Sequence, residues 1–245
     1  MSLFRNIVLA AVIAGLLSGL MLTVMQSFAT VPLIVQAEAF EGAGAEAGHS
    51  HDAAAPADHH DDAEAWMPAD GAERFLYTAA ANMLAGIGFA LLLVTAAEAL
   101  GGLKDWRGGL IFGLAGFLAF SLAPGLGLPP ELPGMPAAEL GARQLWWVAT
   151  AGCTTVALGL LAYTRTPVLA VVAVVLLVLP HILGAPHPAS HETAVPAELH
   201  ARFVAAVLAT SLVFWALLGA VSGLVRTRLR GGEEVYSTGT AEPVR

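Results

Sequence analysis

Long apolar stretches constrain this chain more than any other feature, because each can cross a hydrocarbon layer as a helix. A bilayer core takes roughly 20 apolar residues per helix, and six segments reach or approach that length. They run from Asn6 to Ala29, Phe75 to Leu100, Gly109 to Leu126, Leu145 to Tyr163, Pro167 to Leu183 and Phe203 to Val225. None alternates as barrel strands do, so the sequence predicts an all-α membrane protein, a bundle of about six transmembrane helices.

The composition excludes several functional classes. Charged residues make up 12% of the 245 residues and hydrophobic ones 57%, which leaves too little charge for a soluble enzyme. One cysteine, Cys153, excludes a disulfide framework. A net charge of -8 argues against nucleic acid and favours cations as ligands. The motifs of P-loop ATPases and zinc proteases are absent, and no acid/base pair lies within a span, so we predict no enzymatic activity.

The distribution of Lys and Arg predicts the orientation, because cytoplasmic loops retain positive charge. Eight basic residues fall on one side of the predicted spans: Arg5, Lys104, Arg107, Arg165, Arg226, Arg228, Arg230 and Arg245. Only Arg74, Arg143 and Arg202 fall on the other. We therefore expect both termini in the cytoplasm of a bacterial cell, the chain in the inner membrane, and all eight histidines outside.

The chain divides into four parts by composition. Residues 1–35 are the predicted first transmembrane helix; an alternative is a signal peptide cleaved near Ala37-Glu38-Ala39, which would leave five spans. Residues 36–74 form an acidic, His-rich outer loop. Residues 75–230 are the helical membrane domain, with a Pro/Gly-rich outer loop at 123–144 and a His/Pro-rich outer loop at 184–200. Residues 231–245 are a cytoplasmic tail.

Half of the histidines lie in one twelve-residue stretch, 49–60, inside the first outer loop. His49, His51, His59 and His60 alternate with aspartates and small residues, a composition typical of a disordered tether. Imidazole and carboxylate ligands suit Co(II), Ni(II) and Zn(II). We expect weak, fast-exchanging capture of such ions here; the alternative is a solvated acidic linker.

The other four histidines, His181, His187, His191 and His200, belong to the loop at 184–200 and its flanks. The loop and its flanks are stiffened by four prolines, Pro180, Pro186, Pro188 and Pro196. Pro188 argues against a shared helical face for His187 and His191. Pro196, by contrast, fits the first turn of the sixth helix and would place His200 one turn inside it. We expect an uptake site where the fifth and sixth helices meet, around His181 and His200. The alternative is that each bonds a loop carbonyl.

Polar residues within spans are costly and so are candidates for translocation. Gln26 and Asn82 are predicted in the outer half of the bundle, and an interhelical hydrogen bond is the alternative for Asn82. Glu98 is the one carboxylate within a span, in its last turn. It can act as an inner-gate ligand or proton site, or pair with Lys104 or Arg107. The outer loop at 123–144 is either a plug folded into the bundle or a cap over the helix ends.

Three sequence blocks carry a resemblance to a known family: FRNIVLAAVIAGLLSGLMLTVMQ, LAPGLGLPPELPGMPAAELGARQLWW and LPHILGAP, with a His-rich loop after the first span. The chain resembles the CbtA-type predicted cobalt transporter subunits. That resemblance implies cobalt movement linked to cobalamin synthesis, a small single-span His-bearing companion subunit, and five spans rather than six.

The sequence therefore predicts transport of Co(II), or of Ni(II) or Zn(II), with import as the direction and no permanently bound cofactor. The alternative is a membrane metal-binding or sensing subunit that delivers ions to another permease. The expected partners are the lipid bilayer and the companion subunit; a homo-oligomer is a further option.

Overall fold

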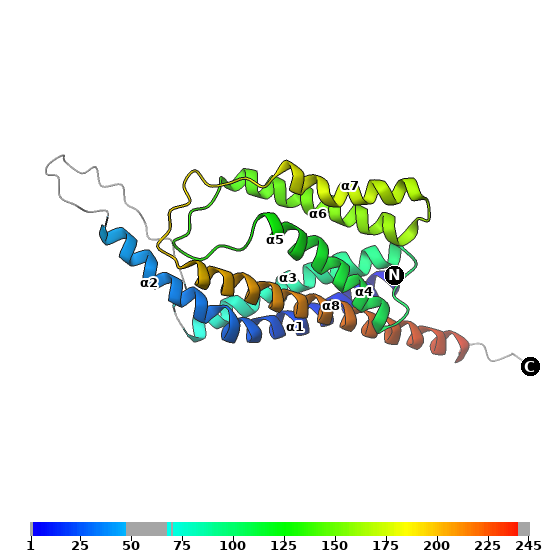
Figure 1. The fold of residues 1–245 in the computed structure, drawn as a ribbon. Helices are drawn as coiled ribbons and strands as arrows, with labels where there is room; N and C mark the ends of the chain where they lie inside the picture. The colour runs from blue at the N-terminus through cyan, green and yellow to red at the C-terminus, as the bar shows by residue number, and fades with distance from the viewer. Residues whose placement is uncertain (1, 48–67, 70, 240–245) are drawn as a thin grey trace, which may run out of the picture.

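The computed structural model of the chain describes residues 2–47, 68–69 and 71–239 (Figure 1). These ranges contain helices and no strands, which confirms the all-α fold class. The helices are α1 (Ser2–Ala29), α2 (Val31–Ala47), α3 (Ala72–Ala99), α4 (Trp106–Phe117), the π-helical turn η1 (Leu118–Leu122), α5 (Ala123–Gly127), α6 (Leu140–Tyr163), α7 (Pro167–Leu183) and α8 (Ala197–Gly239).

All six predicted apolar segments are helical, and five of the helices are long and apolar enough to cross a membrane. These five are Leu3–Ala29, Ala72–Ala99, the continuous α4–η1–α5 stretch Trp106–Gly127, Leu140–Tyr163 and Ala197–Arg230. The remaining predicted segment forms α7, which has 17 residues and is apolar but shorter. The protein is thus a multi-pass membrane protein. Its described residues include five helices long enough to span a membrane and two shorter apolar ones, α7 and the first part of α2.

Local sequence signals explain where the helices begin and end. Asp105 precedes α4, and its carboxylate accepts a hydrogen bond from the Gly108 amide at 2.6 Å. Pro167 opens α7 and Gly184, with φ of 83°, ends it. Pro196 directly precedes α8, one residue before the first turn in which we expected it. Polar residues, prolines and glycines in the sequence therefore mark where these apolar helices begin and end.

Four helices form the tightly packed core, in which α1 lies between α3 and α8, and α4 packs on α8. Glycines allow this packing. A Cβ on Gly15 would overlap the backbone of Ile87 in α3, and one on Gly219 would overlap the carbonyl of Gly109 in α4. Both contacts are of the close, small-residue kind that is common between transmembrane helices.

The α6–α7 hairpin lies beside this core, on the side of α4, η1 and α5 (Figure 1). α7 packs along α6, and it does not pack along α8, which lies on the far side of α4 (Figure 1). The expectation that the fifth and sixth apolar helices meet is therefore wrong. The reason is that α7 is covered by its hairpin neighbour, whereas the glycine faces of α8 are occupied by α4.

The helices at the end where α7 stops and α8 begins carry a cap. Thr30 separates α1 from α2, so residues 36–47, which we expected to belong to a loop, continue as helix. Leu132 of the 128–139 connection is buried among Leu33 and Ala37 of α2 and Leu199 of α8. Of the two interpretations of this Pro/Gly-rich segment, the cap over helix ends agrees with this packing.

Candidate functional site

Four of the predicted metal ligands, His49, His51, His59 and His60, lie outside the described residues. The other four lie at one end of the bundle, where α7 ends and α8 begins. This capped end also carries the last turns of α1 and the first turns of α3 (Figure 1). The start of α1, the α3–α4 connection and the end of the α8 span lie at the opposite end.

His187 and His191 lie next to each other in the connection between α7 and α8. Their ring centroids are 6.3 Å apart at an interplanar angle of 61°, and both side chains are exposed. No helix forms here, in agreement with Pro188, yet the turn of the loop still brings the rings together. Two imidazoles at this spacing can supply two nitrogen ligands to one ion after small ring rotations.

The loop that carries this pair is anchored to the neighbouring cap. The Thr193 hydroxyl donates a hydrogen bond to the Gly134 carbonyl at 3.2 Å, and the Glu192 amide donates to the Ser190 hydroxyl at 3.2 Å. Val195, near the end of the same loop, is buried in a cluster with Leu132 and Leu199. The His187–His191 pair therefore stands on a segment held at several points, which lowers the ordering cost of binding an ion.

His181 and His200, which we expected to share one site, have separate surroundings. His181 lies in the last turn of α7, with its ring 5.8 Å from that of Trp146 in an edge contact. His200 lies in the first turn of α8, and its Nε2 is 3.0 Å from the Pro130 carbonyl oxygen. His200 therefore agrees with the alternative that the histidine bonds a loop carbonyl. The contact joins the first turn of α8 to the 128–139 connection and occupies one of the two ring nitrogens of His200.

Gln26, Asn82 and Thr23 form a polar cluster between α1 and α3 near the capped end. The Asn82 amide donates to Oε1 of Gln26 at 2.6 Å and to the Thr23 hydroxyl at 3.0 Å. Thr23 is fully buried and donates in turn to the Gly19 carbonyl at 2.9 Å. Two of the three residues were predicted as in-span polar candidates; Thr23 was missed, because a helical threonine commonly bonds its own backbone.

The sequence position of Glu98 suggested that it could pair with Lys104 or Arg107, but in the structure it pairs with neither. Its carboxylate binds Arg226 of α8, with 2.9 Å between Oε1 and Nε, and it also binds Arg230. Arg226 is 1% exposed and Glu98 is 13% exposed. α8 continues as a helix past Val225, so the basic run that we interpreted only as a topology anchor contributes a buried ion pair.

One signal for this pair was present in the sequence. Arg226 and Arg230 are four residues apart and therefore share one face of a helix, provided that the helix extends through them. Their partner could not be chosen from the sequence, because the carboxylate lies 128 residues away from Arg226. Nη1 of Arg226 is buried and has no hydrogen-bond partner among the residues that the structure describes.

Glu139 caps the N-terminus of α6 at the histidine-bearing end. Its carboxylate accepts hydrogen bonds from the amides of Gly141 at 2.8 Å and Ala142 at 2.6 Å. These two backbone bonds lower the pKa of the Glu139 carboxyl below its ordinary value. The side chain is thus held as an anion by the helix end rather than offered to a metal.

The described part of the chain contains no group of three or more His, Cys, Asp or Glu side chains arranged to hold a metal ion. Cys153 is a free thiol in α6. The His187–His191 pair alone provides two ligands, fewer than the four usual in a structural zinc site. This arrangement suits capture and release of an ion better than permanent binding.

Comparison with known proteins gives one family match. Residues 4–226 match the model of a family described as "Probable cobalt transporter subunit (CbtA)". Neither the comparison with curated proteins nor that with solved structures finds a match.

Proposed function

Because the chain belongs to the CbtA family of probable cobalt transporter subunits, we propose that it imports cobalt(II), or the similar ions Ni(II) and Zn(II), across the inner membrane. The termini face the cytoplasm in this proposal, and the capped end with its histidines faces outward. This orientation is supported by the distribution of residue types between the two ends of the bundle. The described histidines lie at one end, and Lys104, Arg107 and Arg165 lie at the other. Metal ligands at the uptake end raise the local ion concentration before transport.

The His187–His191 pair is the observation that carries this proposal. Both rings are exposed, adjacent and mounted on an anchored loop. In this proposal the two imidazoles are the first structured site that binds the ion, and water molecules complete its coordination. The histidines at 49, 51, 59 and 60 serve as additional low-affinity ligands that deliver ions to this pair.

Gln26 and Asn82 are proposed as the next ligands inward, because their amide oxygens are neutral donors near the same end. Beyond them the path between α1 and α3 is closed, since Gly19 touches the backbone of Asn82 and Met83, and Gly15 touches Gly86 and Ile87. Movement of an ion along this interface therefore requires α1 and α3 to separate. Glu98, paired with Arg226 and Arg230, lies at the inner end of α3 and is assigned to closing that end.

A non-transporting role is the second candidate, in which the chain captures metal and delivers it to another permease. The closed α1–α3 interface favours it. The word "subunit" in the family description also fits a partner protein, and we propose that the chain works with a companion subunit or as a homo-oligomer. Neither role requires a permanently bound cofactor or enzymatic chemistry.

Uptake of radioactive cobalt into proteoliposomes containing this chain alone separates the two roles. Import predicts uptake by the wild type and at least a several-fold rise in apparent KM for the His187→Ala/His191→Ala double variant. Glu198→Gln, an exposed change in the first turn of α8, is the control and leaves uptake unchanged. An absence of uptake with normal cobalt binding would reject import by the chain alone and support delivery.

The direction is tested in cells that lack the protein. Import predicts a lower cobalt content than in the parent at limiting external metal. A higher content together with reduced tolerance of cobalt would show efflux instead.

A further inference from the structure

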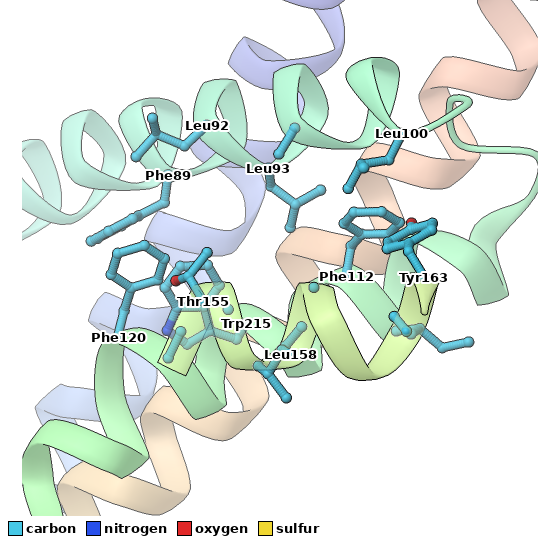
Figure 2. Close-up of a pocket in the computed structure, with 17 residues that line it drawn as sticks. Phe89, Leu92, Leu93, Leu100, Phe112, Phe120, Thr155, Leu158, Tyr163 and Trp215 are labelled. Carbon is cyan, nitrogen blue, oxygen red and sulfur yellow. The ribbon is translucent and has the colours of Figure 1, made fainter. Parts of the chain in front are cut away.

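A cavity of about 360 Å³ lies between α3, α4 and α6, toward the end of the bundle opposite the histidines. Figure 2 shows side chains of α3 on one side of it, and side chains of α4, η1 and α6 on the other. Trp215 of α8 lies at its floor. Phe89, Leu92, Leu93, Phe112, Phe120 and Leu158 contribute much of its surface.

The lining excludes a hydrated ion as the occupant. Thr155 and Tyr163 are its only residues with polar groups beyond the indole of Trp215, within the part of the chain that the structure describes. The Thr155 hydroxyl already donates to the Ala151 carbonyl at 2.8 Å, and the Trp215 indole donates to the Ser121 hydroxyl at 3.0 Å. The surface therefore matches a hydrocarbon ligand.

The cavity is preformed and opens sideways. Phe120 stacks on Trp215 with centroids 5.6 Å apart, and Phe89 lies 4.9 Å from the same ring, so the aromatic floor is fixed by mutual packing. α3 and α6 do not pack extensively on each other, and the rim residues Leu92 and Ile111 are exposed. At this depth the surrounding solvent is lipid, not water.

Basic residues stand at one end of this cavity. Ile111 lies on its wall and is one helical turn from Arg107, on the same face of α4. Tyr163 lies on the opposite wall, two residues before Arg165, while Lys104 follows Leu100 in the α3–α4 connection.

Lys104, Arg107 and Arg165 are exposed, and none forms an ion pair with a described acidic side chain. The two neighbouring carboxylates are already engaged: Asp105 caps α4, and Glu98 is paired with α8. This end of the cavity therefore presents uncompensated positive charge.

We propose that this cavity binds an anionic phospholipid, with one acyl chain between α3 and α6 and the phosphate at Lys104, Arg107 and Arg165. A lipid carries its negative phosphate directly above its hydrocarbon, and the protein carries its basic cluster about one helical turn beyond the apolar walls. A second helix fits less well, because the volume corresponds to only about one turn of a helix with side chains. The lipid bridges the α6–α7 hairpin to α3 where protein contacts are sparse.

Quenching of tryptophan fluorescence tests the site in a full-length variant whose other four tryptophans are replaced by Phe. In that variant a bromine-labelled acyl chain in the cavity lies against the remaining Trp215. The purified full chain is placed in phosphatidylcholine vesicles that contain either brominated phosphatidylglycerol or the same fraction of brominated phosphatidylcholine. The proposal predicts stronger quenching by the glycerol lipid. Each single change of Lys104, Arg107 or Arg165 to Gln lowers this preference about fivefold.

The chain offers a matched pair of variants for the cavity itself. Gly159 lines the cavity and Gly152 lies two turns earlier on α6 without lining it, and an added Cβ meets nothing within 4 Å at either position. Gly159→Leu is expected to abolish the preference for brominated phosphatidylglycerol, whereas Gly152→Leu retains it. Equal quenching by both lipids in the wild type, or an unchanged preference in Gly159→Leu, would overturn the proposal. A different result would assign the cavity to a second copy of the chain. In that case the wild type would show no lipid preference, and native mass spectra would show a dimer that Gly159→Leu dissociates and Gly152→Leu does not.

Discussion

Glu98 and Arg226 form a buried ion pair that joins α3 to α8, with 2.9 Å between Oε1 and Nε. It lies at the end of the core opposite the histidines, where α1 packs between the same two helices. A buried guanidinium is tolerated only with a partner, because its desolvation is otherwise uncompensated. Arg226 therefore depends on Glu98, and the pair determines how α3 and α8 are arranged at the end of the bundle opposite the histidines.

Removing the carboxylate should destabilise the fold strongly. We expect Glu98→Gln to lower the free energy of unfolding by about 3 kcal/mol, because it leaves the Arg226 charge buried without its counterion. Unfolding in mild detergent titrated with dodecyl sulfate measures this value. Arg228→Gln removes an exposed charge from the same helix and should change stability little. Similar losses in both variants would refute the role of the pair.

The glycine contacts of the core should tolerate no side chain. Gly219→Ala brings a methyl group onto the Gly109 carbonyl, and we expect a loss of about 1–3 kcal/mol from overpacking. Gly88→Ala is the control, since a Cβ there meets nothing within 4 Å. It should be neutral or slightly stabilising, because alanine favours the helix. The same unfolding titration compares the two, and equal effects would contradict close packing of α4 on α8.

The two adjacent histidines should act as a unit in metal binding. His187→Ala and His191→Ala are each expected to weaken cobalt binding about as much as the double variant, because one imidazole alone gives no chelate. Equilibrium dialysis measures the dissociation constants. Binding should weaken in acid, since only neutral imidazole ligates a metal. Additive single effects would show independent sites instead.

The Gln26–Asn82 contact should matter more for transport than for stability. An interhelical hydrogen bond in a membrane protein contributes about 0.6 kcal/mol. Asn82 makes two of them, so we expect Asn82→Ala to lower the free energy of unfolding by only about 1 kcal/mol. If Asn82 ligates the moving ion, the maximal uptake rate falls while the apparent KM changes little. A wild-type rate in this variant would remove Asn82 from the path and leave the contact as helix packing.

Glu139 should make the stability of α6 depend on pH. Backbone hydrogen bonds lower the pKa of its carboxyl in the folded chain, so its contribution is complete above the unfolded value of about 4.3. The contribution is lost as the pH falls through the lower, folded pKa. Thermal unfolding should therefore show Glu139→Gln to be less stable than the wild type at neutral pH, with the difference closing in strong acid. A constant difference across this range would exclude the ionised cap.

The linear sequence determined the elements themselves. Long apolar runs can bury their backbone polar groups in lipid only as helices, and Pro167, Asp105 and Pro196 mark helix starts through local backbone chemistry. The sequence also singled out Gln26 and Asn82, because unpaired amides are costly within a membrane.

Only the tertiary structure decided which helices touch and which polar groups pair. Every apolar face of a transmembrane helix resembles the others, and lipid can cover any of them, so the separation of α7 from α8 had no signal in composition. Glu98 had several basic residues within reach along the chain, and close packing of α1 against both α3 and α8 selected Arg226. The exposed pairing of His187 with His191 likewise comes from the path of a loop anchored at Gly134 and Val195, which local propensities do not encode.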